Sequence, residues 1–398
     1  MNSLFFLIGQ FISQIGDQIY NVGLLWWLLK NNYSPKILGT IFAISVIPSV
    51  LVGPFLGVLS DKLDRKKIII YMDIVRGMLM IHIGILCVNN SISLYYLFMA
   101  TFIIGICSAM FDPTILSSIP LIVDGDKNII KLQSRMELIR NLVSVFGPIF
   151  GGFLLTIVSP AISFIINGLS FLISAIMEMF IKFKIQTYEK VIIKDIVNDF
   201  KLGVEFIKKN YILRNLMPLF AIINMIGLPI LQIIVPLLIS KNIGNSLSIG
   251  FFYSLLGVGG ILGALLYSKI PFKKLNIILI GISIFTFSTM LLLIAWNTII
   301  FILSALAYGF TSPIIQIATN MIFLENVPNE MRGKVFSFRR MFSQAFMPIG
   351  LFGIGYITQK ISINVSIFIS IIILLISLIK LLKLINLNKN IQTKIIKE

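Results

Sequence analysis

Long apolar runs alternate with short polar breaks along almost the whole chain. Many of these runs reach the ~20 residues that a helix needs to cross the ~30 Å hydrocarbon core of a bilayer. The pattern therefore predicts an all-α polytopic membrane protein with twelve transmembrane helices. The predicted helices cover residues 4–29, 37–59, 68–88, 94–117, 136–157, 161–182, 214–239, 247–268, 275–296, 299–323, 335–358 and 363–386.

The longest polar break separates the first six predicted helices from the last six. We therefore divide the chain into an N-terminal half at 1–182, a cytoplasmic linker at 183–213 and a C-terminal half with a short cytoplasmic tail at 214–398. Apolar residues recur in the linker at helical spacing, which predicts an amphipathic helix at the membrane surface. These apolar positions are Ile193, Ile196, Val197, Phe200, Val204 and Ile207.

Composition agrees with a membrane protein, because 57% of the residues are hydrophobic and 12% are charged, about half of the ~25% charged residues in a soluble domain. If the N-terminus is cytoplasmic, the cytoplasmic segments hold 28 of the 33 Lys and Arg residues. Four others lie outside and Arg76 lies within a helix. This bias follows the positive-inside rule, so the net charge of +17 predicts cytoplasmic termini rather than a nucleic-acid partner.

The sequence lacks the motifs that would indicate several other functions. The first apolar run has neither a basic leader nor a cleavage site, so it is predicted to be a retained helix. Cys87 and Cys107 lie in apolar runs without metal-ligand spacing, so we expect neither a disulfide nor a metal site. The chain has no Walker A motif and no protease motif, so we expect no enzymatic activity, no direct use of ATP and no cofactor.

The two halves share faint internal repeats. The stretch GPFLG at Gly53–Gly57 has a counterpart in GGILG at Gly259–Gly263, and a basic loop follows each. At an offset of 200 residues, Phe146, Pro148 and Arg140 recur as Phe346, Pro348 and Arg340. Two six-helix repeats joined by a linker are a transporter architecture, with the substrate path between the halves.

Five stretches carry a family resemblance. GVLSDKLDRKK, between the second and third predicted helices, resembles motif A of the major facilitator superfamily, and GPIFGG at Gly147–Gly152 resembles its motif C, which marks exporting branches. IGDQ at Ile15–Gln18, FDPTILSSIPLIV at the end of the fourth helix and VPNEMRGKVFSF at Val327–Phe338 resemble the drug:proton antiporter subgroup that includes macrolide-efflux proteins and the enterobactin exporter. The resemblance covers essentially the whole chain.

The resemblance implies a function and a setting. It implies a monomer in the plasma membrane of a bacterium that exports a small hydrophobic or amphipathic compound, such as a macrolide-like drug, in exchange for protons. Its partners would be the substrate, protons and the lipid bilayer, and the two halves would rock against each other. One departure matters, because residues 94–117 contain no Arg, which many drug antiporters use in proton transfer.

The resemblance also implies a conformational latch at motif A. Asp61 would cap the start of the eleventh helix, and Arg65 would reach Asp112. Asp64 stands where the family usually has Gly. The residues expected to form the latch are Gly57, Asp61, Lys62, Arg65, Lys66, Lys67 and Asp112. The residues expected to allow close helix packing at motif C are Gly147, Pro148, Gly151 and Gly152.

Asp17 is the first candidate for proton coupling. It lies thirteen residues into the first predicted helix, ~20 Å deep, where an ionised carboxylate costs ~2.5–3.5 kcal/mol. His82, the only histidine, is a second candidate, and for both residues the alternative is a structural hydrogen bond. Gln10 and Gln14 share a helix face with Asp17, which predicts a polar stripe that lines a cavity or bonds to neighbouring helices.

Other polar residues fall within predicted helices. Asp73 and Arg76 are three residues apart and are expected to form a structural pair. Glu137, Arg140 and Glu178 lie near cytoplasmic ends and are expected to act as interfacial anchors. The uncharged candidates for the substrate cavity, which could equally join helices, are Asn224, Gln232, Gln316, Asn320 and Gln344.

Three alternatives to drug export stay open. The chain could export a siderophore or another endogenous metabolite, or it could be a proton symporter that imports its substrate on the same fold. A non-transport membrane sensor is the third, but the longest loop is too short for an output domain.

Overall fold

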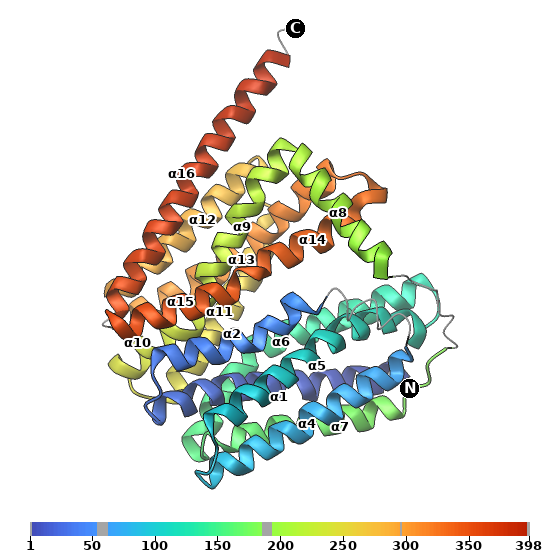
Figure 1. The fold of residues 1–398 in the computed structure, drawn as a ribbon, viewed down its shortest axis with the longest axis vertical. Helices are drawn as coiled ribbons and strands as arrows, with labels where there is room; N and C mark the ends of the chain where they lie inside the picture. Colours follow the sequence, from blue (N-terminus) through green and yellow to red (C-terminus); the bar gives the residue numbers. More distant parts are fainter. Residues whose placement is uncertain (1, 54–62, 185–192, 295–296, 396–398) are drawn as a thin grey trace. The chain divides into compact units, whose positions relative to one another are not determined.

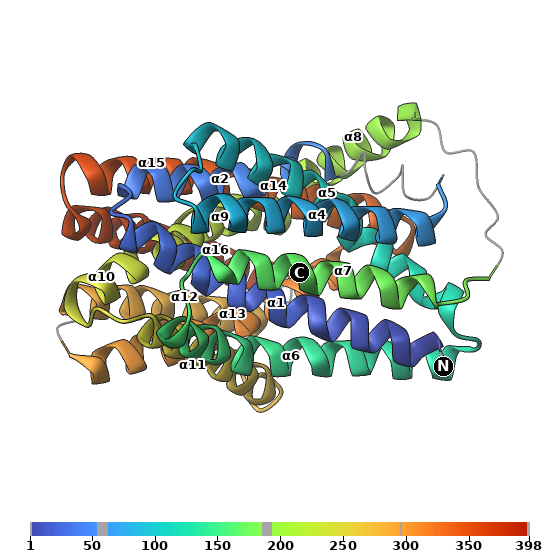
Figure 2. The same ribbon diagram turned by 90° about the horizontal axis from the view of Figure 1, so that it is seen from below.

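The computed structural model describes residues 2–53, 63–184, 193–294 and 297–395. The described residues form helices and connecting turns and contain no strand. They divide into two compact units: Met1–Ile193 with Ile239–Ser254 form the first, and Lys194–Leu238 with Leu255–Glu398 form the second. The ribbon views show both sets of helices (Figures 1 and 2).

The first unit is built from long helices that pack side by side (Figure 1). Helix α7 contacts both α1 and α4, while α6 contacts α1 and α5 contacts α2 and α4. Its helices are α1 (Asn2–Lys30), α2 (Pro35–Leu51), α4 (Arg65–Val88), α5 (Leu94–Ile122), α6 (Asp126–Ile157) and α7 (Ile162–Met179). The helix α11 (Ser246–Tyr267) also belongs to this unit as far as Ser254.

The second unit packs around an apolar core. Leu213, Ile278, Ile314 and Phe323 are fully buried in that core, and they come from helices that lie far apart in the sequence. Its elements are α8 (Ile193–Lys209), α9 (Tyr211–Pro229), η1 (Ile230–Ile234), part of α10 (Val235–Asn242), the rest of α11, α12 (Lys274–Leu291), η2 (Leu292–Ile294), α13 (Thr298–Asn326), η3 (Asn329–Met331), α14 (Arg332–Ala345), α15 (Met347–Lys360) and α16 (Ile363–Ile395).

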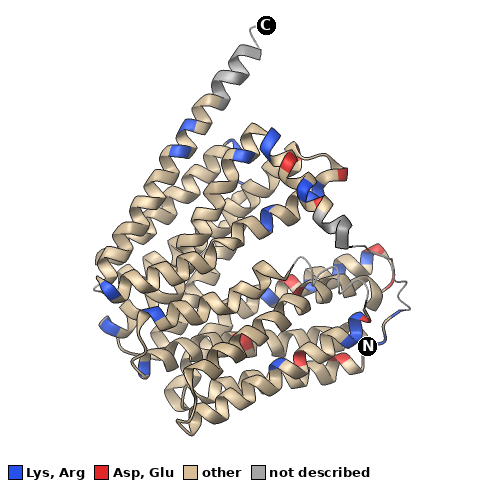
Figure 3. Cartoon of the chain, viewed as in Figure 1, with Lys and Arg blue, Asp and Glu red and all other residues tan. Residues whose placement is uncertain are grey.

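Among the described residues, ten of the twelve predicted membrane segments match helices of membrane length and hydropathy, and α1 and α2 are the other two. Ten helical segments among the described residues are long and apolar enough to cross a membrane, and α2 is a shorter apolar helix. α1 spans 29 residues but carries a polar stripe that includes Gln10, Gln14 and Asp17. Most charged residues lie toward helix ends, while a few lie within the long helices of the first unit (Figure 3).

Three helix boundaries differ from the prediction. α6 begins at Asp126 rather than 136, because Leu132 and Met136 are buried in the core of the first unit. The seventh predicted helix contains a π-helical turn, η1, directly after Pro229, since proline cannot donate the regular backbone hydrogen bond. The eleventh is divided into α14 and α15 just before Pro348 for the same reason.

The amphipathic helix predicted in the linker is α8, and it packs against the start of α14 within the second unit. Asp199 forms an ion pair with Lys334 at 2.8 Å, and the rings of Phe200 and Phe338 meet edge to face at 5.0 Å. A Cβ atom on Gly203 would lie 2.8 Å from the carbonyl oxygen of Lys334. The helix is therefore attached to a transmembrane segment as well as joining the two halves.

Glycines let helices of the second unit approach each other at backbone distance. A Cβ atom on Gly309 of α13 would lie 2.1 Å from the carbonyl oxygen of Leu256 on α11, and one on Gly350 of α15 would lie 1.8 Å from that of Met225 on α9. Real Cβ atoms cannot approach so closely, so both helix pairs depend on the missing side chain.

We predict that Gly350→Ala destabilises the second unit, because α15 must move away from α9. Overpacking of this kind costs about 1–3 kcal/mol or more. Gly353→Ala is the matched control, since a Cβ atom there meets nothing within 4 Å and should stabilise the helix by ~0.4–1 kcal/mol. Thermal unfolding of the purified proteins in detergent measures both, and equal midpoints for the two variants would contradict the packing argument.

Candidate functional site

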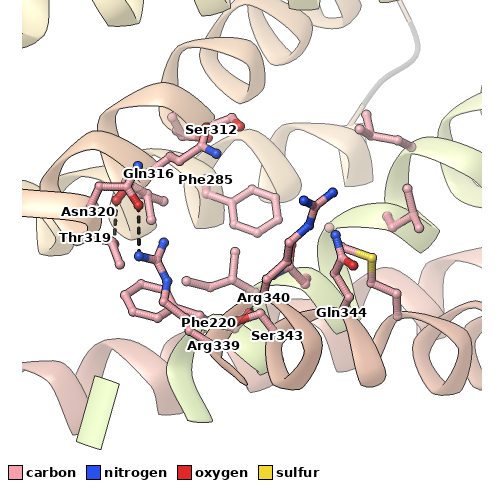
Figure 4. Close-up of a pocket in the computed structure, with 18 of the residues that line it drawn as sticks. Phe220, Phe285, Ser312, Gln316, Thr319, Asn320, Arg339, Arg340, Ser343 and Gln344 are labelled. Carbon is pink, nitrogen blue, oxygen red and sulfur yellow. Dashed lines mark hydrogen bonds between the residues drawn. The ribbon is translucent and has the colours of Figure 1, made fainter. Parts of the chain in front are cut away.

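The second unit contains a cavity of about 820 Å³, a volume within the ~300–1,000 Å³ range of small-molecule sites. Helices α9, α12, α13 and α14 form its walls, with the start of α15 (Figure 4). Aromatic rings and neutral polar groups alternate around it. Its polar lining residues are Asn224, Tyr308, Thr311, Ser312, Gln316, Thr319, Asn320, Ser337, Arg339, Arg340, Ser343 and Gln344.

Four of the seven residues proposed from sequence for the substrate cavity line this one: Asn224, Gln316, Asn320 and Gln344. They come from α9, α13 and α14, so the fold brings together positions up to 120 residues apart. Of these residues, Asn320 accepts a hydrogen bond from Arg339, which also lines the cavity. Gln232 lies in η1 and is not among the lining residues. Gln10 and Gln14 lie on α1 in the first unit and do not line the cavity.

Arg339 is held in place by aromatic rings and one amide. Its guanidinium carbon lies 4.5 Å from the ring centre of Phe323 and 5.6 Å from that of Phe336, distances at which a cation attracts an aromatic face. Its Nη1 atom donates to the Asn320 side-chain oxygen at 2.8 Å. The cation is thus fixed against one wall of the cavity (Figure 4).

Arg340 follows directly and also lines the cavity, with its side chain exposed. It extends into the cavity near Gln344, which lies one helical turn later (Figure 4). In the sequence both arginines count among the cytoplasmic charges, and that pattern does not predict their place in the cavity. The pair of adjacent arginines inside a predicted helix was the signal that could have revealed it.

Tyr308 braces another wall. Its hydroxyl donates to the carbonyl oxygen of Gly227 at 2.7 Å, and its ring packs edge to face on Phe285 with centroids 4.8 Å apart. These contacts join α13 to α9 and α12, which fixes the spacing of the three helices that carry most of the lining.

The first unit contains a buried ion pair between Asp73 and Arg76 of α4, as the sequence predicted. Asp73 is 0% exposed and Arg76 4%. The guanidinium lies between the rings of Phe111 and Phe171, at 4.1 and 4.3 Å. A buried cation needs such partners, because leaving it unpaired in an apolar interior costs several kcal/mol.

Further acidic groups surround this pair. Asp17 of α1 accepts a hydrogen bond from the side-chain nitrogen of Asn167 on α7 at 3.1 Å, and its carboxylate interacts electrostatically with Arg76, Asp73 and Asp112. Four transmembrane helices thus bring their polar groups together. Gln10, on the same face of α1, is also buried, at 5% exposure.

Glu178 of α7 corrects an expectation. Its position near a helix end predicts an interfacial anchor, but it is 1% exposed and interacts electrostatically with Asp73 and Arg76. Neither of its carboxylate oxygens has a hydrogen-bond partner among the described residues. Glu137 and Arg140 differ, since they form an exposed ion pair at 2.7 Å. We name Asp17, Asp73, Arg76, Asp112 and Glu178 the acidic cluster.

His82, the second proton-coupling candidate, lies on an exposed face of α4. Its Nδ1 atom is hydrogen-bonded to the hydroxyl of Tyr96 on α5, and the two rings pack edge to face. His82 is not among the groups that act on the Asp17 carboxylate.

Three latch residues, Gly57, Asp61 and Lys62, lie outside the described residues. Of the others, Arg65 reaches α5, the helix of Asp112, and donates to the carbonyl oxygen of Ser117 at 2.8 Å. Lys66 donates to the carbonyl oxygen of Met179, at the end of α7, at 2.8 Å, and Lys67 lies 4.0 Å from Asp64.

Asp64, the departure from motif A, has a structural explanation. Its side chain accepts hydrogen bonds from the backbone nitrogens of Lys66 and Lys67, so it caps the N-terminus of α4. Such a cap typically contributes ~1 kcal/mol.

The motif C residues lie at close helix contacts of the first unit. A Cβ atom on Gly147 would lie 2.7 Å from Gln18, and one on Gly151 would lie 3.1 Å from Ile19, both on α1. On another side of α6, a Cβ atom on Gly250 of α11 would lie 2.3 Å from the carbonyl oxygen of Pro148. Ser246 adds a hydrogen bond to the Gly152 carbonyl at 3.1 Å.

We predict that Arg76→Met lowers the free energy of unfolding by ~3–5 kcal/mol, because it leaves Asp73 buried without its cation. Adding Asp73→Asn should recover most of the loss. Arg140→Met is the control, since an exposed ion pair is worth ~0–1 kcal/mol. Thermal unfolding of the purified variants tests this, and a double variant no more stable than Arg76→Met would contradict it.

A bundle of membrane-length helices in two units, with polar groups inside each, defines a polytopic membrane transporter. The chain belongs to the Major Facilitator Superfamily, whose model matches residues 6–351 and 219–394.

Two proteins of similar sequence have names that refer to export. The chain is 27% identical over 350 residues to the protein named "Putative bacilysin exporter BacE" of Bacillus subtilis, covering 84% of each chain. It is 22% identical over 361 residues to macrolide efflux protein A of Streptococcus pyogenes, covering 89% of each. The crystal structure of the nucleoside transporter NupG has the same fold, with a TM-score of 0.75 at 15% identity, covering 98% of this chain and 100% of that one.

Proposed function

We propose that the chain exports a small organic molecule from a bacterial cell in exchange for protons, acting as a monomer with cytoplasmic termini. Two of its relatives carry the names of exporters, which favours export over import. The observation that carries the exchange with protons is the position of Asp17, a carboxylate in a membrane-length helix, hydrogen-bonded to Asn167 beside other acids and one arginine.

The acidic cluster is suited to taking up and releasing a proton. It holds four carboxyl groups around one arginine, so the carboxyl groups cannot all be ionised at low energetic cost within an apolar bundle. A proton entering the cluster would reside on Asp17 or Glu178, because Asp73 is paired with Arg76. A change in that charge would bias the bundle between conformations that differ in how the cluster is solvated.

The energy available is sufficient for export. One proton crossing 100 mV contributes ~2.3 kcal/mol, and one pH unit contributes ~1.4 kcal/mol. Their sum, ~3.7 kcal/mol, supports a substrate gradient of several hundred-fold.

Motif A and motif C would contribute to the change between conformations as the two halves rock against each other. Arg65 and Lys66 tie the beginning of α4 to α5 and α7, which is the arrangement that a cytoplasmic latch requires. The close contacts of Gly151 and Gly250 would exclude water and solutes from between their helices. The cavity of the second unit supplies an aromatic and polar surface for the substrate.

Asp17→Asn is the direct test of proton coupling. It keeps the shape and hydrogen-bonding capacity of the side chain but removes the exchangeable proton, so we expect at least a tenfold loss of proton-driven efflux with normal membrane insertion. Glu137→Gln is the matched control, because Glu137 is an exposed acid paired with Arg140, and its efflux should be unchanged.

The measurement is efflux of Nile red, a neutral dye, from energised cells of an efflux-deficient host that express each variant, with acidification of everted vesicles followed in parallel. Unchanged proton exchange in Asp17→Asn would remove Asp17 from the mechanism. Greater Nile red accumulation on expression of the unmodified chain would overturn export in favour of import.

A further inference from the structure

The cavity of the second unit carries a charge that the proposed export of a hydrophobic drug does not explain. Two of its lining residues are charged, Arg339 and Arg340, and both are cations. None of the described residues that line it is Asp or Glu. A cationic amine drug would therefore meet repulsion here, whereas an anion would meet two positive charges.

The two arginines have different surroundings. Arg339 is fixed by Asn320 and by the ring faces of Phe323 and Phe336. Among the described residues, no hydrogen bond or ion pair of the Arg340 side chain is found. Because a guanidinium presents its N–H groups as a flat fork, Arg340 can donate two parallel hydrogen bonds to a carboxylate.

The neighbours of Arg340 complete a site for such a group. Gln344 lies one turn along α14, so its amide can donate to the same anion. Phe285 and Phe220 supply apolar surface in the same cavity (Figure 4). A ligand with a carboxylate at one end and an apolar or planar body would satisfy both kinds of wall.

We propose that Arg340, with Gln344 and the fixed charge of Arg339, is a carboxylate-binding subsite, and that the transported substrate is a small amphipathic acid or zwitterion. This inference rests on the proposed export function and names its substrate class. Export of such an anion from a cell that is negative inside gains ~2.3 kcal/mol per charge for each 100 mV.

The test is equilibrium binding of two matched fluorescent probes, dansylglycine and dansylglycinamide, to the full-length protein in nanodiscs of phosphatidylcholine. The probes differ only in a carboxylate that becomes a neutral amide. Hydrogen bonds to a charged group are worth ~1.5–3 kcal/mol, so we expect dansylglycine to bind roughly ten- to hundredfold more tightly.

Substitutions test whether Arg340 causes the preference for dansylglycine over dansylglycinamide. Arg340→Gln should reduce the preference to less than about threefold, and Arg340→Lys, which keeps the charge without the fork, should leave an intermediate value. Arg140→Gln is the control, because Arg140 is an exposed arginine of α6 paired with Glu137, and it should keep the full preference. Equal affinities of the two probes, no saturable binding of either, or an unchanged preference in Arg340→Gln overturns the proposal.

A second arm distinguishes a solute from a lipid, since a phospholipid headgroup could supply the same anionic chemistry. Nanodiscs containing phosphatidylglycerol should bind dansylglycine with unchanged affinity. Loss of probe binding there, reversed by returning to phosphatidylcholine, would assign the site to a lipid headgroup and overturn the substrate proposal.

The binding assay contains no proton gradient and no transport step. Failure of export or of proton coupling would therefore leave its result intact, and Asp17→Asn should bind both probes as the unmodified chain does. A failed probe preference together with intact proton-driven efflux would overturn the subsite alone.

Discussion

An ionised group inside an apolar helix bundle must have a partner, and this constraint organises the first unit. Arg76 is the cation around which the acidic cluster is arranged, and it is enclosed by Asp73 and two aromatic rings. The ion pair itself lies within α4, and the ring contacts of Phe111 and Phe171 connect its guanidinium to α5 and α7. Asp17, Asp112 and Glu178 are the carboxyl groups of the cluster outside this ion pair, and Asn167 donates a hydrogen bond to Asp17.

The second unit meets the same constraint in a different way. The charged residues of its cavity are cations, and Arg339 is stabilised by aromatic faces and an amide rather than by an acid. The pseudo-repeat makes the contrast specific, because Arg140 and Arg340 occupy equivalent positions in the sequence. Arg140 forms an exposed ion pair with Glu137, whereas Arg340 faces a cavity. The two arginines therefore have different surroundings in the two units.

Close backbone contacts provide the rigidity that both sites need. Gly147, Gly151 and Gly250 bring α6 to within backbone distance of α1 and α11, and Gly350 does the same for α15 and α9. Helices in lipid gain little from hydrophobic burial, so such contacts supply much of their association. Tyr308 and Asn320 then fix the spacing of the cavity walls through single hydrogen bonds.

The sequence by itself determined the helices, the linker helix and the ion pair of Asp73 with Arg76, because apolar run length, helical periodicity and i, i+3 spacing are local properties. It also indicated four of the cavity residues, since a neutral polar side chain inside an apolar run is conspicuous. The burial of Glu178, the docking of α8 on α14 and the position of Arg339 and Arg340 in a cavity were decided only by the tertiary structure. From the sequence alone, a charged residue near a helix end is predicted to be an interfacial anchor. Whether neighbouring helices bury it depends on parts of the chain that are distant in sequence.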